Sequence, residues 1–242
     1  WCFLARSCQT SFANDITKIR SLVGSSPAYR THSDMSLSVY FAGELFNAKH
    51  LAGNAGLAAA IHRRSNGRFL CVLPQTMESR EEGAHFIRDE DLEHLLCADI
   101  AIFNFDGSEI DSGTVVEFMV AKFADIPALL LRTDFRRGGD QGQDPWNLML
   151  SFYPRTKACC LDGMALYKTA LAQGLDQLGA ADWMLDQIAE QVVKELEELA
   201  QLKPILPSAL TNSVHDWLVQ FPGFRSPESI TRIRQALARK SS

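Results

Sequence analysis

The sequence has none of the features that mark a membrane protein or a nucleic-acid-binding protein. No apolar run approaches the roughly 20 residues that are needed to span a bilayer. Its 29 aspartates and glutamates outnumber its 24 lysines and arginines, so there is no basic excess to neutralise a phosphate backbone. A P-loop and a G-x-G-x-x-G motif are also absent. We therefore expect neither a membrane nor a nucleic acid as a partner.

Metal-ligand and disulfide patterns are missing as well. The six histidines show no zinc-ligand spacing with one another or with a cysteine. None of the six cysteines belongs to a C-x-x-C motif, and the adjacent Cys159 and Cys160 are poorly placed to pair with each other. The simplest interpretation is reduced thiols in a cytoplasmic protein. We predict no metal and no cofactor.

What the chain does contain is a strand, a loop and a helix between residues 98 and 121. Ile100–Phe105 is an apolar run rich in β-branched and aromatic residues, which predicts a buried strand. An acidic loop with a glycine follows, and an apolar pattern of helical period begins near Ser112. Open α/β sheets bind ligands at the carboxyl ends of their strands. The loop is therefore expected to lie in a binding site.

Predicted strands alternate with predicted helices along the rest of the chain. Helices are expected at His50–Arg64 and Arg88–Cys97, and strands at 37–42, 68–73, 100–105, 127–132 and 158–161. This alternation is typical of a parallel sheet with right-handed crossovers. We predict the α/β class, with a flavodoxin-like parallel sheet flanked by helices and an added C-terminal helical segment.

We divide the chain into an N-terminal extension, an α/β domain and a C-terminal helical extension, at 1–34, 35–175 and 176–242. The arginine- and serine-rich first part favours an appended or mistranslated segment, with organelle targeting as the alternative. The polar loop Thr133–Asp144 is long for such a domain, which suggests a lid or an interface segment. An apolar stripe over Asp182–Leu202 predicts an amphipathic helix that packs on the domain or on a partner subunit.

Glu117 is the unusual residue of the helix predicted after the acidic loop. Its neighbours one turn away are all uncharged: Gly113, Thr114, Val120 and Ala121. The helix dipole favours a carboxylate in the first turns, whereas an apolar flank removes water from it. This combination suits a nucleophile. The alternative is a glutamate that the dipole alone favours.

Several short motifs follow one another between residues 37 and 168. They are Val39-Tyr40-Phe41-Ala42-Gly43 with Phe46-Asn47, Leu73-Pro74-Gln75, Arg88 to Asp91, Ala98-Asp99, Asp111-Ser112-Gly113-Thr114-x-x-Glu117 and Asn147-Leu148-Met149. Their order and spacing are more specific than any one motif. In these residues the chain resembles the nucleoside 2-deoxyribosyltransferase family, which has a flavodoxin-like parallel α/β fold.

The resemblance implies two sets of site residues. The catalytic set consists of the nucleophile, two residues that serve the leaving base and a residue that holds the nucleophilic carboxylate: Glu117, Asp91 with Asp111, and Tyr40. The substrate-binding set comprises Gly43, Phe46, Gln75 and Asn147. The last of these is implied to reach the site of a neighbouring subunit.

Taken alone, the residues leave simpler interpretations open. Asp91 lies in an acidic run, which by itself predicts a solvated helix face. Asp111 precedes Ser-Gly-Thr, which suits a turn or a helix cap. Tyr40 is compatible with a strand core and Asn147 with a helix cap. Gln75 after a proline is uninformative.

The resemblance implies base exchange on 2′-deoxynucleosides, in nucleotide salvage. Cleavage of the N-glycosidic bond builds oxocarbenium character at C1′, which a carboxylate stabilises and then captures, as in retaining glycosidases. Carboxyl groups with raised pKa values can serve the departing base. A second purine or pyrimidine then attacks C1′ with net retention. The implied partners are 2′-deoxynucleosides and free bases, in a homo-oligomer if Asn147 completes a neighbour's site.

Two alternatives stay open. The first is a nucleoside or deoxynucleoside 5′-monophosphate N-glycosidase, a hydrolase in which a serine at the position of Asp111 holds the phosphate. Asp111 and Glu44 would repel a phosphate, which favours a free nucleoside. The second is a non-catalytic nucleotide-sensing or scaffold module whose C-terminal helices bind another protein. The presence of every acidic position of the site argues against it.

Overall fold

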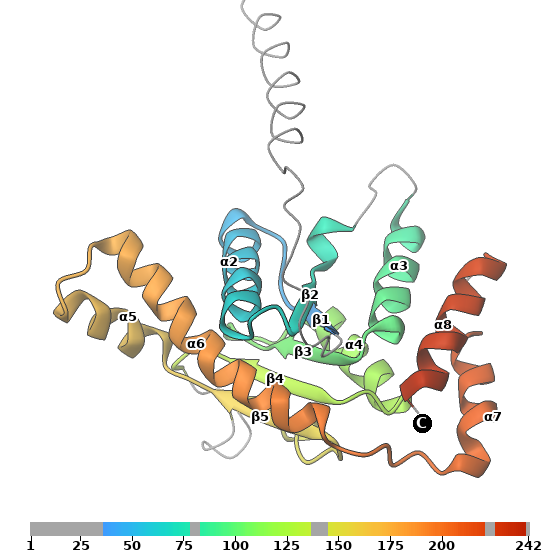
Figure 1. Ribbon diagram of the computed structural model, residues 1–242. Helices are drawn as coiled ribbons and strands as arrows, with labels where there is room; N and C mark the ends of the chain where they lie inside the picture. The colour runs from blue at the N-terminus through green and yellow to red at the C-terminus, as the bar shows by residue number, and fades with distance from the viewer. Residues whose placement is uncertain (1–35, 78–82, 137–144, 221–225, 241–242) are drawn as a thin grey trace, which may run out of the picture. The chain divides into compact units, whose positions relative to one another are not determined.

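A computed structural model describes residues 36–77, 83–136, 145–220 and 226–240. These residues belong to one compact unit, Met35–Ser242, and the predicted extension 1–34 lies outside them. In the described part of the chain, five parallel strands form one sheet in the order β2-β1-β3-β4-β5 (Figure 1). They are β1 (Leu37–Ala42), β2 (Phe69–Val72), β3 (Ile100–Asn104), β4 (Ala128–Arg132) and β5 (Thr156–Cys160). This is the flavodoxin-like order, and the predicted fold class is confirmed.

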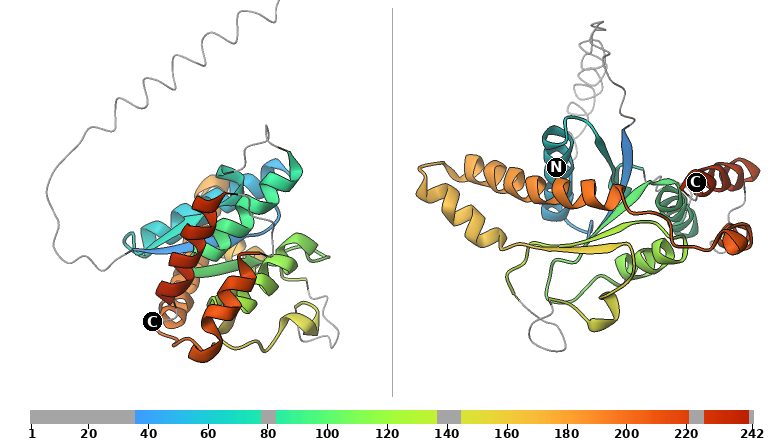
Figure 2. Two further views of the ribbon diagram at one scale, coloured as in Figure 1. Left: turned by 90° about the vertical axis from the view of Figure 1, so that its right-hand side faces the viewer. Right: turned by 60° about the horizontal axis from the view of Figure 1, so that its bottom comes forward.

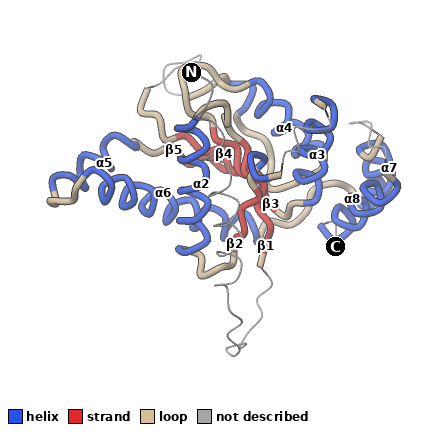
Figure 3. The backbone as a smooth tube through the Cα atoms, turned by 90° about the horizontal axis from the view of Figure 1, so that it is seen from above, coloured by secondary structure: helices blue, strands red, loops and turns tan. Residues whose placement is uncertain are grey.

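Helices cover both faces of the sheet (Figure 3). One face carries α2, α5 and α6, and the other carries α3, α4, α7 and α8. The bounds are α2 (Ala48–Arg64), α3 (Ala84–Cys97), α4 (Ser112–Phe123), α5 (Gly163–Ala172), α6 (Gln177–Ala200), α7 (Ser208–Leu218) and α8 (Pro227–Lys240). Because both faces are covered, the strands are apolar almost throughout rather than alternating.

Side chains alternate between two cores, one on each face of the sheet. On β1, Val39 and Phe41 belong to the core under α2 and α6, whereas Tyr40 and Ala42 belong to the core under α3 and α4. The strand β3 alternates in the same way, with Ile102 on the α2 and α6 side. A polar residue at a strand end is therefore assigned to one face by its position in the pleat.

The C-terminal helices complete these two cores (Figure 2). Ile188, Val192 and Leu196 on α6 are buried against α2 and the sheet, so this amphipathic helix packs on its own domain. On the opposite face, α8 packs against α3. There Arg232 Nε donates to Glu93 Oε1 at 2.6 Å, and Lys240 Nζ donates to the carbonyl of Leu96 at 2.6 Å.

Local chemistry explains where the predicted helices shift. Pro145 followed by apolar residues is typical of a helix start, but the chain forms only a single 3-10 turn there, Leu148–Leu150, with Asn147 as its cap. The helix α3 begins four residues before the predicted start, directly after Gly83, whose φ of 95° favours glycine. Most of the predicted lid or interface loop, residues 137–144, lies outside the described residues. Among the described helices, none is both long and apolar enough to cross a membrane.

Candidate active site

A short hydrogen bond joins two of the predicted catalytic residues. Tyr40 lies in the middle of β1 and is fully buried, and its hydroxyl donates to Glu117 Oε1 at 2.6 Å. The contact forms because the pleat directs Tyr40 to the face on which α4 packs. A distance of 2.6 Å is typical of a charge-assisted bond to a carboxylate. The phenol therefore orients Glu117 and favours its ionised form.

The surroundings of Glu117 oppose that ionisation. Burial raises the pKa of the Glu117 carboxyl from 4.5 to about 7, and the negative charges of Asp91 and Asp111 act in the same direction. The hydrogen bond from Tyr40 lowers the pKa but does not outweigh burial. Glu117 therefore titrates near neutral pH, as a largely desolvated carboxylate. Perturbed groups of this kind cluster at functional sites.

Asp111 is the N-cap of α4. Its Oδ2 accepts hydrogen bonds from the backbone N–H of Thr114 at 2.7 Å and from the Thr114 hydroxyl at 2.9 Å. A side chain at Gly113 would come within 3.1 Å of the same oxygen, so glycine keeps this turn open. Both cap bonds use Oδ2, and the cap leaves Oδ1 for another contact. The capping role thus coexists with a charge that acts on Glu117.

Asp91 projects from α3, which packs beside α4 on the same face. Its side chain is half-buried, unlike the solvated helix face that its acidic neighbours predict. Its charge contributes to the raised pKa of Glu117. Glu117 therefore interacts with three of the predicted catalytic residues. Tyr40 from β1 donates a hydrogen bond to it, and the charges of Asp91 and Asp111 raise its pKa.

Two of the predicted substrate-binding residues, Gln75 and Asn147, form hydrogen bonds with groups other than Glu117. Gln75 donates to the carbonyl of Leu51 at 2.9 Å and accepts from Asn54 at 3.3 Å, so its amide faces α2. Asn147 is exposed, and its side chain accepts from the backbone N–H of Met149 at 2.9 Å. Among the described residues, no hydrogen bond joins either amide to Glu117. Their predicted roles stay predictions.

The loop after β1 holds the other two residues of the substrate-binding set. Gly43 lies against the end of β3, where an added Cβ would come 3.1 Å from the Cβ of Asn104. Phe46 is 73% exposed at the surface. The loop thus brings a backbone close to β3 and leaves the ring of Phe46 exposed.

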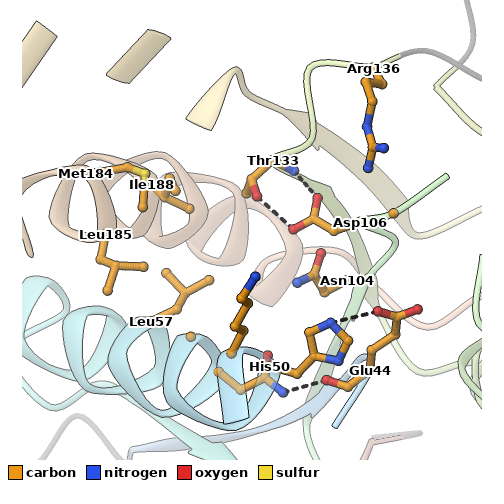
Figure 4. A pocket seen from close by; sticks show the side chains of 14 residues that line it. Glu44, His50, Leu57, Asn104, Asp106, Thr133, Arg136, Met184, Leu185 and Ile188 are labelled. Atoms are coloured by element: carbon orange, nitrogen blue, oxygen red, sulfur yellow. Dashed lines mark hydrogen bonds and ion pairs between the residues drawn. The ribbon is translucent and has the colours of Figure 1, made fainter. Parts of the chain in front are cut away.

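A cavity of about 390 Å³ lies at the same edge of the sheet but on the α2 and α6 face (Figure 4). Tyr40, Asp91, Asp111 and Glu117 do not line it. Its polar lining includes Glu44, which was expected to repel a phosphate at the nucleoside site, and His50 and Asn104, which were not predicted to belong to a site. For Asn104, the sequence signal was a polar residue at the end of an otherwise apolar strand.

Residues 39–149 match the family model described as nucleoside 2-deoxyribosyltransferase. These residues form a segment of the nucleoside 2-deoxyribosyltransferase family within the α/β domain. The resemblance drawn from the motifs is thereby confirmed. The match begins one residue before Tyr40 and ends just after Asn147, so the segment contains all eight predicted site residues of this family domain.

Three solved structures resemble the chain. A conserved protein from Enterococcus faecalis V583 is 22% identical over 68% of this chain and 99% of its own, with a TM-score of 0.43. A 2-deoxyribosyltransferase from Bacillus psychrosaccharolyticus is 23% identical over 47% and 79%, with a TM-score of 0.38. A 2-desoxiribosyltransferase from Leishmania mexicana is 21% identical over 57% and 99%, with a TM-score of 0.41. No curated protein matches the sequence.

Proposed function

We propose that this protein is a nucleoside 2-deoxyribosyltransferase, which exchanges the base of a 2′-deoxynucleoside for another purine or pyrimidine. The observation that carries the proposal is the largely buried Glu117 carboxylate, which accepts a 2.6 Å hydrogen bond from Tyr40. Its family membership supports the reaction class. Each C-terminal helix buries one face against the rest of the domain, which argues further against a module built only to present them.

In the proposed reaction, a Glu117 oxygen forms a bond to C1′ of the sugar while the bond from C1′ to the base nitrogen breaks. Both electrons of the broken bond leave with the base, which takes a proton or a hydrogen bond from the pair Asp91 and Asp111. The product is a deoxyribosyl ester of Glu117. A nitrogen of a second base then attacks C1′, gives its proton to the pair Asp91 and Asp111, and releases the carboxylate, and two inversions give net retention.

The electrostatics suit these steps. A desolvated carboxylate is a stronger nucleophile than a hydrated one, and Tyr40 fixes its direction of attack. Positive charge that develops at C1′ is attracted by the carboxylates around Glu117, and this attraction is stronger in a dry site than in water. The same negative field repels a phosphate. Glu44 pairs with His50 at 3.0 Å on the other face, so the argument for a free nucleoside now depends on Asp111.

The proposed function is tested by incubating purified protein with 2′-deoxyinosine, with and without adenine, cytosine or thymine, and separating the products by chromatography. A new deoxynucleoside that forms only with a second base supports exchange. Free hypoxanthine and deoxyribose that accumulate without regard to acceptor would identify a hydrolase instead. No reaction with deoxynucleosides or their monophosphates would overturn the catalytic proposal.

Asp111 allows a matched pair of substitutions that separates its two roles. Asp111→Ser keeps a capping oxygen for α4, whereas Asp111→Ala removes it, at a cost of about 1 kcal/mol in the free energy of unfolding. Both variants lose the carboxyl group. We expect both to lose about 10²- to 10⁴-fold in turnover, because general acid catalysis contributes that much. Unfolding in urea should distinguish them, and Asp111→Ser with wild-type turnover would restrict Asp111 to capping.

Tyr40→Phe removes only the hydroxyl that contacts Glu117. Because that hydrogen bond lowers the pKa of Glu117, its loss should move the pKa above about 7 and shift the acid limb of the pH–rate profile upward. The carboxylate would also lose its orientation, and we expect kcat near pH 7 to fall about 10- to 100-fold. If kcat falls while the acid limb of the profile stays at the wild-type pH, the proposed effect of Tyr40 on the ionisation of Glu117 is contradicted.

The same proposal assigns Asn147 to a neighbouring subunit's site in a homo-oligomer. Close to Asn147 the side chains of Met149 and Phe152 are 72% and 87% exposed, an apolar surface that suits a contact between subunits. Sedimentation of the active protein tests this assignment, and full activity in a monomer would contradict it. The cytoplasm, predicted from the cysteines, is the proposed location, and fractionation of cells that contain the protein tests it.

A further inference from the structure

The cavity on the α2 and α6 face is lined by residues that take no part in the proposed reaction (Figure 4). It is enclosed by α2, by the N-terminal half of α6 and by the segments that follow β3 and β4. Its volume of about 390 Å³ falls within the range of about 300 to 1,000 Å³ that is usual for small-molecule sites. Like Glu117, it lies at the carboxyl edge of a parallel sheet, where such ligands bind.

One wall of the cavity is apolar. Leu57 from α2 faces Leu185 and Ile188 from α6, as Figure 4 shows. The two helices approach closely at Gly56, where an added Cβ would lie 2.8 Å from Leu185 Cδ1. One turn earlier, at Gly53, an added Cβ would meet no atom within 4 Å. The helices therefore diverge from Gly56 toward the start of α2, leaving an apolar space that suits a flat ring.

The facing edge of the cavity is polar and includes a buried acceptor. Asn104 Oδ1, at the end of β3, is buried and has no hydrogen-bond partner among the described residues. Figure 4 shows this amide between Asp106 and the pair formed by Glu44 and His50. A buried carbonyl oxygen without a donor is costly, and native structures satisfy nearly all of them. A ligand that carries an N–H group would satisfy this one.

Most of the charged groups that line the cavity already have partners. The lining holds two cations, Lys49 and Arg136, and two anions, Glu44 and Asp106, and Arg136 also forms an ion pair with Asp134 at 2.5 Å. Asp106 already accepts three hydrogen bonds, from the backbone N–H of Thr133 at 2.5 Å, from its hydroxyl at 2.7 Å, and from the backbone N–H of Asp134 at 2.8 Å. The paired Glu44 and His50, at 3.0 Å, are also mutually compensated. Neither an anion nor a cation is therefore favoured over a neutral ligand.

We propose that this cavity is a second ligand site, which binds a neutral planar heterocycle whose edge carries N–H and C=O groups. Free nucleobases and nucleosides share this chemistry. The ring lies against Leu57 and Ile188, and a ring N–H donates to Asn104 Oδ1. The site is on the opposite face of the sheet from Glu117 and does not depend on the proposed reaction.

Gly53 supplies the test, because its missing side chain opens onto the cavity. Gly53→Phe fills the space, whereas Gly53→Ala adds one methyl group and leaves it open. Both substitutions favour the helix over glycine, so both variants should fold. Equilibrium dialysis of the full chain measures binding of adenine, hypoxanthine and cytosine. A Glu117→Ala background allows the same measurement with 2′-deoxyinosine, which is then not consumed.

We expect Gly53→Ala to bind one equivalent of base or nucleoside more than Gly53→Phe does. Asn104→Leu, which keeps the branched shape but removes the acceptor oxygen, should weaken this equivalent at least tenfold. Equal binding by the two Gly53 variants would overturn the proposal. So would a cavity that takes only inorganic phosphate or a nucleoside 5′-monophosphate.

Turnover of the same variants separates this proposal from the proposed function. An inactive protein that still shows the difference between Gly53→Ala and Gly53→Phe would contradict the transferase alone. An active protein without that difference would contradict the second site alone. The comparison of nucleobase with nucleoside identifies which of the two the cavity accepts more tightly.

Discussion

Glu117→Ala is expected to lower turnover of 2′-deoxynucleosides by at least about 10⁴-fold, the scale of loss seen when a catalytic nucleophile is removed. The reason is covalent: alanine has no oxygen to capture C1′, and water in its place cannot reproduce a positioned and desolvated carboxylate. Tyr40 would lose the acceptor of its 2.6 Å hydrogen bond, so orientation is lost as well. Steady-state rates with 2′-deoxyinosine and adenine measure the effect.

Glu109→Ala is the matched control for this experiment. Glu109 lies in the same loop between β3 and α4 but is exposed to solvent. We expect it to keep wild-type turnover. Mass spectrometry of acid-quenched wild-type protein should also detect one added deoxyribosyl group, which Glu117→Ala should lack. Glu117→Ala with more than one hundredth of the wild-type rate would rule out Glu117 as the nucleophile.

Glu117→Gln is expected to stabilise the folded protein at alkaline pH. The pKa of this carboxyl is about 7 in the folded protein against an ordinary value of 4.5, so the folded state holds its proton more tightly than the unfolded state does. The stability due to that proton is fully present below about pH 4.5 and is lost as the pH rises through 7. Above pH 7 the fold carries a desolvated negative charge, which the neutral glutamine amide removes.

The expected gain is large at pH 8 and small at pH 5. A difference between about 7 and 4.5 corresponds to about 3 kcal/mol in the free energy of unfolding, at about 1.4 kcal/mol for each unit of pKa. Urea unfolding of the wild type, Glu117→Gln and the control Glu109→Gln from pH 5 to pH 8 measures it. A gain that does not depend on pH would contradict the raised pKa. Stability gained with activity lost is the usual trade-off at an active site.

Strand and helix alternation could be predicted from the sequence because apolar periodicity is a local property. The strand Leu37–Ala42 was predicted with its observed bounds, and the flavodoxin-like order followed from the alternation. Errors occurred where a backbone cap decides. The helix α3 starts directly after Gly83, which has a positive φ, and the helical segment after Pro145 consists only of the 3-10 turn Leu148–Leu150. Neither leaves a periodic signal.

The residues of the candidate site could be predicted from the sequence, but their contacts with one another could not be derived from it. The order of the motifs was enough to name Glu117, Asp111, Asp91 and Tyr40, whose roles stay predictions until they are measured. The resemblance implied that Tyr40 holds the Glu117 carboxylate, but the residues alone could not tell, because 77 positions separate the two and either face of β1 was open to a buried tyrosine. From the sequence, Asp111 could be either a helix cap or a site residue. In the fold it caps α4, and its charge also raises the pKa of Glu117.

The sequence by itself determined the α/β class, the positions of the strands and the family of the domain, since each depends on residue types at short spacings. Only the tertiary structure decided which face each strand side chain occupies and how strongly burial raises the pKa of Glu117. The cavity beside Asn104 likewise requires α6, whose residues lie about eighty positions further along the chain. Burial and cavities arise from packing between distant segments, and no local pattern encodes them.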